Sequence, residues 1–510
     1  MAKVSILYPI FRNQQDVLRD LKTIHNQTEK DVDLLVLDQR SGKNKDSKSR
    51  VLQLFPKVNW IEKQFKNIAE MMNFGFSRAA SDLLIYMPPN IGLKPNLVQA
   101  YSDAFQSSGM PGMIFADYAE VLPDGKIEEK RLRDYDGDIT ERGNFGYVKG
   151  YSLKAAKAVG YYDEQFNRAE EYDFRLKLSE HHDLIRVPDV RYDVFISPEK
   201  ASEKMSVGAS KLFYPGEGKY GGFSYLFYDK DEEQEIERAF YNYLKRIGAY
   251  LTHENEAVVY GPDEKQSPMV SVIIPVYNRA AFIGKAIDSV LNGKFQDFDI
   301  IVVDNGSTDN TIEVVESYIR KDPRVRLIKN KENVIALSLN LAVNASTAKY
   351  ISQLDSDDEY TPITLEAMTG HLENNPKCGL AISYYELIDE VGNLLEEFGI
   401  IKHLEYNRNN ILRVDGAGAV RTWHRKVMLE MGGFNVEHFG HYGEDYDLVL
   451  KVSEKYDVCR VQEVCYRYRR HADNTDIKRE PEIKIYNKTL ARKMAIRRRI
   501  ALNQKLGLLK

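Results

Sequence analysis

The sequence contains the same pattern twice, and this internal repeat constrains the fold more than any other feature. The segment VSILYPIF at residues 4–11 returns as VSVIIPVY at residues 270–277, and DLLVLD at residues 33–38 returns as DIIVVD at residues 299–304. Both pairs lie 266 residues apart (275 minus 9 for the prolines, 304 minus 38 for the last aspartates). A long repeat that keeps its spacing indicates a duplicated structural unit. We therefore expect two domains of one architecture.

A third matching pair lies further along each copy. EEYD at residues 170–173 corresponds to EDYD at residues 444–447, at a spacing of 274 residues (444 minus 170), so the second copy holds eight more residues before this point. A chain of 510 residues is also too long for one ordinary core. The predicted parts are a domain at residues 1–197, a linker at 198–268, a domain at 269–476 and a tail at 477–510.

Composition excludes several classes of function. Hydrophobic residues make up 43% and charged residues 29% of the chain, as in ordinary globular proteins. The net charge of -5 provides no basic field, so we expect no nucleic-acid partner. No run approaches the roughly 18 apolar residues of a membrane-spanning helix, and we expect a cytoplasmic protein. The spacing of Cys378, Cys459 and Cys465 matches neither a disulfide framework nor a CxxC metal site, so we expect reduced cysteines.

Short runs rich in β-branched residues alternate with stretches of helical periodicity. In the second copy SVIIPVY, DIIVVD and KYISQLD are separated by helix-like stretches such as Phe282–Leu291 and Asn310–Lys321. Uninterrupted apolar strands joined by helices are typical of a parallel sheet covered on both faces. The sequence therefore predicts two α/β domains with mostly parallel central sheets and helices on both faces. Such sheets bind ligands beyond the carboxyl ends of their strands.

The segments outside the two copies differ in composition. Breaker-rich residues 215–222 predict a loop or hinge, and apolar residues at helical spacing predict a helix at about 229–251 that packs between the domains. The tail from Lys478 to Lys510 holds 11 Lys or Arg against two Glu. Such a basic amphipathic helix either makes a peripheral contact with an anionic membrane, here at the inner membrane face, or packs on its own domain.

An acidic turn carries the main chemical signal in the second copy. Asp355-Ser356-Asp357-Asp358 follows directly on the apolar run that ends at Leu354. Three carboxylates in one turn repel one another at neutral pH, and a divalent cation would relieve that repulsion. Oxygen ligands of this kind suit Mg²⁺ or Mn²⁺, which bind one or two carboxylates together with substrate phosphates. A solvated acidic turn is the alternative interpretation.

Polar residues also follow other strands of the second copy. Asp304 opens the turn DNGSTD, where a carboxylate can hydrogen-bond a base or ribose, or can cap the next helix. In GEDYD, Glu444, Asp445 and Asp447 lie at the start of a helical pattern. One carboxylate suffices as a helix cap, and the surplus favours an acid or base. His471 ends YRYRRH, either as a metal ligand or as a surface residue.

Together these motifs resemble the family-2 glycosyltransferases of the GT-A fold, the Rossmann-like fold of nucleotide-diphospho-sugar transferases. The resemblance covers almost all of residues 269–476, through the order of VSVIIPVYN, VVDNGSTD, ENVIALSLN, LDSDD, GGFN, GEDYDL and YRRH. It implies a role for each matching residue. The implied donor-binding residues are Pro275, Tyr277, Asp304, Asn333 and, at the ribose, Asp355, and the implied ligands of Mn²⁺ or Mg²⁺ are Asp357 and His471.

The resemblance also implies how the reaction proceeds. Asp445 is the implied catalytic base of an inverting displacement, in which an acceptor hydroxyl attacks the anomeric carbon opposite the departing diphosphate and the metal offsets the charge on that leaving group. Glu444 and Trp423 are expected on the acceptor side, where Trp423 either stacks on a sugar or belongs to the core. Val334 and Ile335 depart from the small Gly-containing stretch common in the family, which leaves the donor pocket's shape open.

The implied substrates follow from the family and not from individual residues. The donor is a nucleotide-diphosphate sugar, with UDP favoured and dTDP and GDP open, and the transferred group is a hexosyl or N-acetylhexosaminyl unit. The acceptor is a glycan or glycoprotein, as in polysaccharide or cell-surface glycan synthesis. A scaffold that binds carbohydrate or nucleotide without turnover is the alternative. An oxidoreductase is disfavoured because no GxGxxG follows the first strand.

The first copy lacks the chemistry of the second. Pro88-Pro89-Asn90 stands where the second copy has Asp355-Ser356-Asp357, while Glu171 and Ser197 stand at the positions of Asp445 and His471. Asp38 and Asn67 keep the nucleotide-binding positions. We expect a degenerate glycosyltransferase-like domain. A second, metal-independent transferase that uses Glu171, which would make the chain bifunctional, is the alternative.

Overall fold

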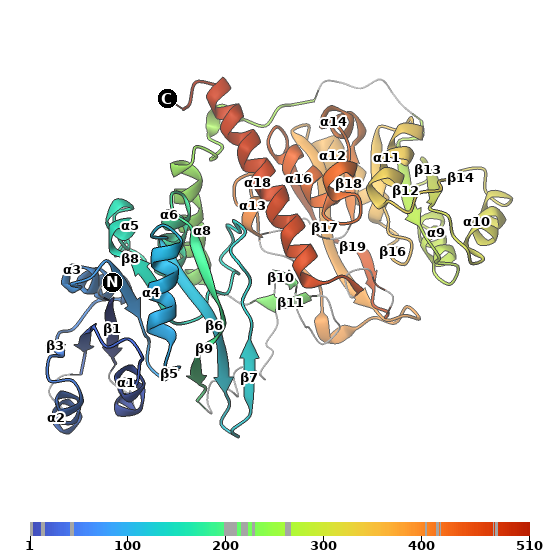
Figure 1. The fold of residues 1–510 in the computed structure, drawn as a ribbon. Coiled ribbons are helices and arrows are strands. Elements are labelled where there is room, and N and C mark those ends of the chain that lie inside the picture. Colours follow the sequence, from blue (N-terminus) through green and yellow to red (C-terminus); the bar gives the residue numbers. More distant parts are fainter. Residues whose placement is uncertain are drawn as a thin grey trace. The chain divides into compact units, whose positions relative to one another are not determined.

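The chain forms two compact units. The computed structural model describes residues 4–11, 16–40, 45–197, 212–215, 223–226, 230–260, 267–402, 405–414, 418, 420–472, 474 and 478–509. The first unit comprises Met1–Gly208 and Tyr228–Tyr243, and the second comprises Ala209–Phe227 and Leu244–Lys510. Figure 1 shows that each unit has its own sheet and its own helices. The domain limits and roles assigned above remain predictions.

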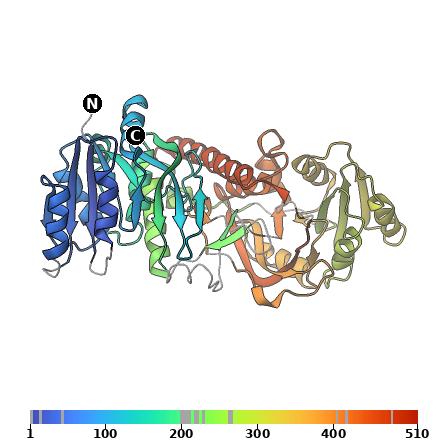
Figure 2. The same cartoon turned by 60° about the horizontal axis from the view of Figure 1, so that its bottom comes forward.

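The first unit is built on a nine-stranded mixed sheet with the order β3-β2-β1-β4-β8-β6-β9-β5, in which β7 pairs with β6. The segment β3-β2-β1-β4 is parallel, and β8 joins it antiparallel to β4. Helices alternate with the parallel strands, as the blue part of Figure 2 shows. The strands are β1 (Val4–Ile10), β2 (Val32–Asp38), β3 (Asn59–Glu62), β4 (Leu83–Tyr86), β5 (Ile91–Leu93), β6 (Met113–Val121), β7 (Ile127–Lys130), β8 (Lys149–Ser152) and β9 (Leu184–Phe195). The helices are α1 (Val17–His25), α2 (Lys45–Leu54), α3 (Ile68–Arg78), α4 (Leu97–Ser107), α5 (Leu153–Ala158) and α6 (Glu170–Ser179).

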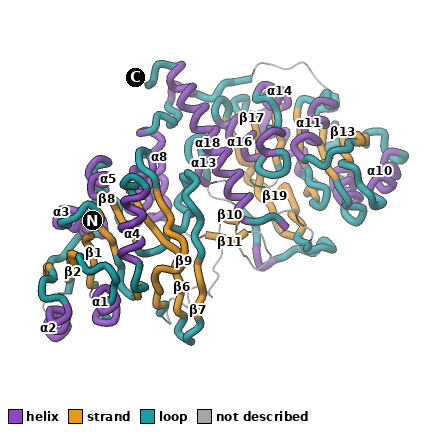
Figure 3. Tube along the Cα trace, in the orientation of Figure 1, coloured by secondary structure: helices purple, strands orange, loops and turns teal. Residues whose placement is uncertain are grey.

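The second unit is built on an eight-stranded mixed sheet with the order β14-β13-β12-β15-β18-β17-β19-β16. Its strands are β12 (Val270–Val276), β13 (Phe298–Asp304), β14 (Val325–Lys329), β15 (Tyr350–Gln353), β16 (Glu359–Tyr360), β17 (Cys378–Ile388), β18 (Arg421–His424) and β19 (Asp457–Arg469). Its helices are α9 (Ile283–Leu291), α10 (Thr311–Ile319), α11 (Ile335–Ala345), α12 (Thr364–Asn374), α13 (Ile411–Val414), α14 (Arg425–Glu430), α15 (Val436–Phe439), α16 (Glu444–Ser453) and α18 (Pro481–Lys505), with short 3-10 turns at His253–Asn255 and Glu396–Phe398. Figure 3 shows the alternation of helix and strand.

The two sheets share one plan. Read from one edge, the two strand orders correspond element by element, from β3 and β14 to β5 and β16. The pairing register is also the same, since Val4 pairs with Val32 in β1 and β2 and Val270 pairs with Phe298 in β12 and β13. The predicted α/β fold class, with two sheets of one architecture, is confirmed.

The apolar runs explain the position of the second sheet. Every residue of β12 is buried, and so are the last five residues of β13. Such strands need cover on both faces, which the crossover helices α9, α10 and α11 provide. Because β12, β13 and β15 run parallel, their carboxyl ends lie at one edge of the sheet. The turns that begin after these three strands therefore gather at that edge.

The segment between the repeats is partly described. Residues 216–222 of the predicted hinge lie outside the described residues, while β10 (Leu212–Pro215) and β11 (Phe223–Leu226) pair antiparallel on either side. The predicted linker helix is present as α8 (Lys230–Arg246), and Gly248, with φ of 75°, follows its end. A positive φ favours glycine, as expected just beyond a helix.

The basic tail forms α18, which packs on α16 within the second unit (Figure 1). Arg492 donates from Nε to the carbonyl oxygen of Leu412 at 2.7 Å, and Arg499 donates from Nη2 to Ser453 Oγ at 3.1 Å. Both arginine side chains are buried. Of the two interpretations of the basic tail, the structure shows the helix packed on its own domain. No helix among the described residues is long and apolar enough to span a bilayer.

The cysteines differ from expectation. Cys378 and Cys459 form a disulfide across 81 residues, with their Cα atoms 5.9 Å apart, and Cys465 is free and buried. The prediction that no disulfide forms is wrong for this pair. The local spacing of the cysteines carried no such signal, because the pairing of β17 with β19 brings Cys378 and Cys459 together.

Asn503 holds the end of α18 in place, and its removal tests this packing. Its Nδ2 donates to the carbonyl oxygens of Gly248 and Tyr250 at 2.8 and 2.9 Å, and its Oδ1 accepts from Asn255. Asn503→Ala leaves these buried groups unsatisfied, so we expect it to lower the free energy of unfolding by about 2–3 kcal/mol in urea denaturation. The exposed neighbour Gln504→Ala should have no measurable effect. Equal stability of both variants would contradict the assigned role.

Candidate active site

The three carboxylates of the acidic turn after β15 lie in three different environments. Asp358 points into the unit, where its Oδ1 accepts from the backbone N–H of Arg469 and its Oδ2 from the hydroxyl of Tyr466, both at 2.7 Å. Burial, with the charges of Asp357 and Asp355, raises the pKa of Asp358 well above its ordinary value. Asp358 is therefore a structural residue that fixes the turn to β19.

Asp357 lies beside two nitrogen-bearing side chains. Its Oδ2 is 3.0 Å from Nε2 of His471 and 3.2 Å from Nε of Arg279. Burial alone would raise the pKa of Asp357, but the hydrogen bond from His471 and the charge of Arg279 bring it below its ordinary value. His471 is itself buried and stacks on Phe282, with ring centroids 4.7 Å apart. The structure thus brings together the two predicted metal ligands, which are 114 residues apart in sequence.

The donor atoms of this pair fit a hard or borderline divalent cation. A carboxylate oxygen and a neutral imidazole nitrogen are both ligands of Mn²⁺, and Mg²⁺ also binds carboxylates. Two protein ligands leave room for water and for the phosphates of a substrate. The guanidinium of Arg279 lies on the same carboxylate, so a cation bound to Asp357 competes with it.

Asp355 is the third carboxylate of the turn. Burial, followed by the charge of Asp357, raises the pKa of Asp355 to about 6. Its backbone N–H lies 3.3 Å from the hydroxyl of Tyr466. The charge of Arg421 opposes this rise in the pKa of Asp355.

A second carboxylate group opens α16. Gly443 precedes the helix with φ of 86°, in the left-handed region that favours glycine, and turns the chain so that Glu444 and Asp445 are the first helical residues. Asp445 Oδ2 is 2.6 Å from Nη2 of Arg421, and the Asp445 side chain is 27% exposed. Partial exposure of an oriented carboxylate is what a base needs in order to reach a substrate hydroxyl.

Arg421 links the two carboxylate groups. It opens β18, where it pairs with Gln353, two residues before Asp355. Its charge lowers the pKa values of Asp355 and Glu444, which burial raises. The charge of Asp445 in turn raises the pKa of Asp355. The carboxylates of the acidic turn and of the start of α16 are therefore close enough to interact electrostatically with Arg421 and with one another. This is consistent with a single candidate site.

The predicted nucleotide-binding residues lie at the carboxyl ends of β12 and β13. Pro275 belongs to β12, Tyr277 follows it and is 40% exposed, and Asp304 ends β13. The carboxylate of Asp304 accepts from the backbone N–H groups of Gly306 and Ser307, at 3.1 and 3.2 Å through Oδ2. Asn333 is exposed in the loop before α11. Asp304 therefore caps its own turn, and its role toward a base remains a prediction.

Trp423 is not available to a substrate. Its side chain is fully buried in β18 and packs edge-to-face with Phe434, with ring centroids 6.2 Å apart. The expectation of a sugar-stacking Trp on the acceptor side is therefore wrong, and the alternative of a core Trp holds. Just before β18, residues 416, 417 and 419 lie outside the described residues.

Sequence reasoning missed three arginines of the site. Arg279 follows the VSVIIPVYN motif, and Arg421 precedes the buried Trp423. Arg469 lies inside YRYRRH, where its Nε donates to the carbonyl oxygen of Asp357 at 2.8 Å. A search for cations to balance the surplus of acidic motifs could have found Arg279, directly after one quoted motif, and Arg469, within another. No local pattern marks Arg421, because strand pairing with Gln353 places it.

The equivalent region of the first unit is organised around different pairs. Arg40 binds Asp38 through two hydrogen bonds of 2.9 Å, and both residues are buried. Both oxygens of the Asp38 carboxylate are thus used within the protein. Lys149 pairs with Glu171 at 2.5 Å, as Arg421 pairs with Asp445 in the second unit.

Comparison with known proteins gives the family of the chain. The model of the family "Glycosyl transferase family 2" matches residues 271–429. An uncharacterized glycosyltransferase of Haemophilus influenzae is 31% identical over 222 residues, which cover 41% of this chain and 67% of that protein. The chain belongs to glycosyltransferase family 2.

Other relatives extend beyond the matched part. The chondroitin synthase of Escherichia coli is 29% identical over 284 residues, which cover 53% of this chain and 40% of that protein. Several curated relatives match over only about a third to three fifths of their own length. Among solved structures, Staphylococcus aureus TarS in complex with UDP-GlcNAc overlaps 41% of this chain and 61% of that one, at 18% identity and a TM-score of 0.35.

Glu444 gives the site a measurable pH signature. Burial, followed by the charge of Asp445, raises the pKa of Glu444 to about 8. Between its unfolded pKa near 4.5 and about 8, the unfolded state has lost this proton and the folded state keeps it, so stability falls as pH rises. Glu444→Gln removes this penalty. We expect the variant to gain stability over the wild type by on the order of 3 kcal/mol from pH 5 to pH 8 in urea denaturation. The exposed Glu437→Gln should show no such trend.

Proposed function

We propose that the second unit transfers a hexosyl or N-acetylhexosaminyl group from a nucleotide-diphosphate sugar, with UDP favoured, to a hydroxyl of a glycan or glycoprotein acceptor, with inversion at the anomeric carbon. One observation carries the proposal. The Asp357–His471 pair and the Asp445–Arg421 pair belong to one electrostatic site at the carboxyl edge of the sheet. A protein that only bound sugar would need neither a clustered pair of metal-ligand types nor an oriented, half-exposed carboxylate.

Asp445 acts as the base in this proposal. Its carboxylate accepts the proton of the acceptor hydroxyl, so that the hydroxyl oxygen attacks the anomeric carbon while the bond to the diphosphate breaks on the opposite side. Arg421 orients Asp445 through the contact of its Nη2 with Oδ2. Glu444, with its raised pKa of about 8, stays protonated at neutral pH and can donate a hydrogen bond on the acceptor side.

The donor end uses other residues. Asp355, Tyr277, Pro275, Asp304 and Asn333 bind the nucleoside in this proposal. Asp357 and His471 hold the divalent cation, Mn²⁺ or Mg²⁺, which supplies charge compensation on the departing diphosphate when bound. The guanidinium of Arg279, which lies beside Asp357, would also favour an anion there.

The biological product follows from the relatives and is part of the proposal. A chondroitin synthase is among the similar proteins, which supports a role in the synthesis of a polysaccharide or a cell-surface glycan. A cytoplasmic enzyme that uses soluble nucleotide sugars agrees with this role. The buried arginines of α18 give no support to membrane contact through the tail.

The first unit has no catalytic role in this proposal. Arg40 occupies the carboxylate of Asp38, and prolines replace the residues of the acidic turn. The Lys149–Glu171 pair retains a cation and a carboxylate without the other groups. A degenerate domain that supports the second unit or its acceptor accounts for these features.

Asp445→Asn tests the base. A positioned base contributes about 10²–10⁴-fold to the rate, and an amide accepts no proton, so we expect kcat to fall by about that factor while donor affinity is unchanged. Nucleoside diphosphate release from a panel of UDP-, GDP- and dTDP-sugars measures the first quantity, and calorimetry with the active donor measures the second.

Glu171→Gln is the matched control in the first unit, and we expect it to leave turnover unchanged. Loss of activity in Glu171→Gln with retention in Asp445→Asn would move the chemistry to the first unit. Absence of turnover with every donor would favour the scaffold that binds without reaction.

Removal of the metal tests the Asp357–His471 pair. We expect nucleoside diphosphate release to stop with a chelator and to return with Mn²⁺ or Mg²⁺. His471→Ala should raise the Mn²⁺ concentration for half-maximal rate by about 10–100-fold, because it removes a proposed metal ligand. Removing even a side chain that only hydrogen-bonds to a metal ligand lowers metal affinity by this factor. His438→Ala, which alters a half-exposed histidine elsewhere in the unit, should not change it. Release that ignored the chelator would exclude the cation from the proposal.

A further inference from the structure

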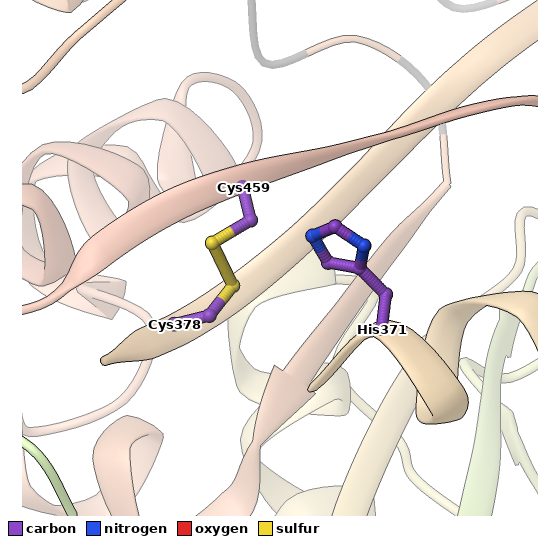
Figure 4. A group of neighbouring side chains, drawn as sticks. All are labelled: His371, Cys378 and Cys459. Carbon is purple, nitrogen blue, oxygen red and sulfur yellow. A yellow bond between two sulfur atoms is a disulfide. The ribbon is translucent and has the colours of Figure 1, made fainter. Parts of the chain in front are cut away.

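One cluster of metal-ligand side chains lies apart from the active site. His371, Cys378 and Cys459 place a ring nitrogen and two sulfur atoms within 4.8 Å of one another, and Figure 4 shows the imidazole of His371 facing the two sulfur atoms. It is the one such group of three that the described part of the chain contains. Neither the acidic turn nor α16 contributes to it.

Three separate elements hold this cluster in place. His371 lies on α12, Cys378 opens β17, and Cys459 lies near the start of β19. Cys459 is ten residues before Arg469 on the same strand, which is roughly 33 Å at the rise of a β-strand. The cluster is therefore remote from His471 and Asp357, although it shares β19 with them.

His371 has the properties of an available ligand. Its side chain is half-buried, with a ring nitrogen within 4.8 Å of both sulfur atoms. Burial lowers the pKa of His371, which favours the neutral imidazole. A neutral imidazole has a free lone pair, which is the form that binds metal ions.

The two cysteines have two states available to them. They form a disulfide in this structure. Cys378 Sγ also lies 3.2 Å from the carbonyl oxygen of Leu380, which could accept from a thiol at this position. Two thiolates and one imidazole around a common point are a ligand set for a soft or borderline cation such as Zn²⁺, and not for the hard cations that suit Asp357.

We propose that reduction of the Cys378–Cys459 disulfide opens a Zn²⁺ site formed by Cys378, Cys459 and His371. A dithiol supplies two electrons and two protons to the disulfide, giving two thiols, and is itself oxidised to a disulfide. Zn²⁺ then displaces one proton from each thiol and binds both thiolates and the imidazole. His371 and Cys459 are half-buried, so water can provide the fourth ligand on the open side.

In this proposal, a Zn²⁺ bridge replaces the disulfide that links β17 and β19. The oxidised chain has a covalent bond between the strands, and the reduced, metal-loaded chain has a bridge through the cation that also includes α12. Either link holds together the strands that lead to Asp389 and His471. The inference does not depend on the proposed sugar transfer.

Cobalt titration of the full chain tests the site. Co²⁺ replaces Zn²⁺ and gives a thiolate-to-metal charge-transfer band that carboxylate and imidazole ligands do not give, so binding at Asp357 and His471 does not interfere. We expect the reduced chain to develop this band and to saturate at one equivalent, and the oxidised chain to show none. Zn²⁺ should abolish the band by displacing Co²⁺.

Variants assign the ligands. His371→Ala should weaken Co²⁺ binding at least about tenfold, and Cys378→Ser should abolish the band, while Cys465→Ser, which alters the cysteine outside the cluster, should leave it intact. A melting curve of each variant checks that it is folded, and the comparison of oxidised and reduced wild type needs no variant. A reduced wild-type chain without the band, or a band that survives in Cys378→Ser, would overturn the proposal.

Discussion

The active-site edge of the second unit depends on how three carboxylates are kept within one turn. Tyr466 and the backbone of Arg469 donate hydrogen bonds to Asp358, and His471 and Arg279 contact Asp357. Asp355 is buried beside Asp357, and its pKa is raised to about 6, with the charge of Arg421 opposing the rise. The protein's own groups thus offset part of the mutual repulsion. The turn can form before any ligand arrives, and it joins β15 to β19 because two of the stabilising groups lie on that strand.

Much of the fold followed from local sequence, and the site followed in part. The apolar runs marked β12, β13 and β15, and helical spacing marked α9 and α10 to within a few residues. Residues that follow strand ends, such as Asp357, could be assigned to one edge because parallel strands place them there. The disulfide, Arg421 and the burial of Trp423 could not, because each depends on pairing between strands that are distant in sequence.

The two units show what a shared sheet does and does not determine. Strand order and register are the same, yet Asp38 is bound by Arg40 while Asp304 bonds to the backbone of its own turn. Arg40 stands at the position that Gly306 has in the second unit. The two units therefore share a backbone plan while the residues at the edge of the sheet differ, since the core positions that build the sheet are separate from the positions at its edge.

For the cation site proposed at Asp357, the contact with Arg279 has a consequence for the energetics of ion binding. The carboxylate of Asp357 is already paired with the guanidinium of Arg279, which acts as its counterion. Binding is then an exchange of one positive partner for another, and its net free energy is the difference between two attractive interactions. At the proposed metal site, retention of the ion would therefore depend on whether a phosphate is present to receive the displaced arginine.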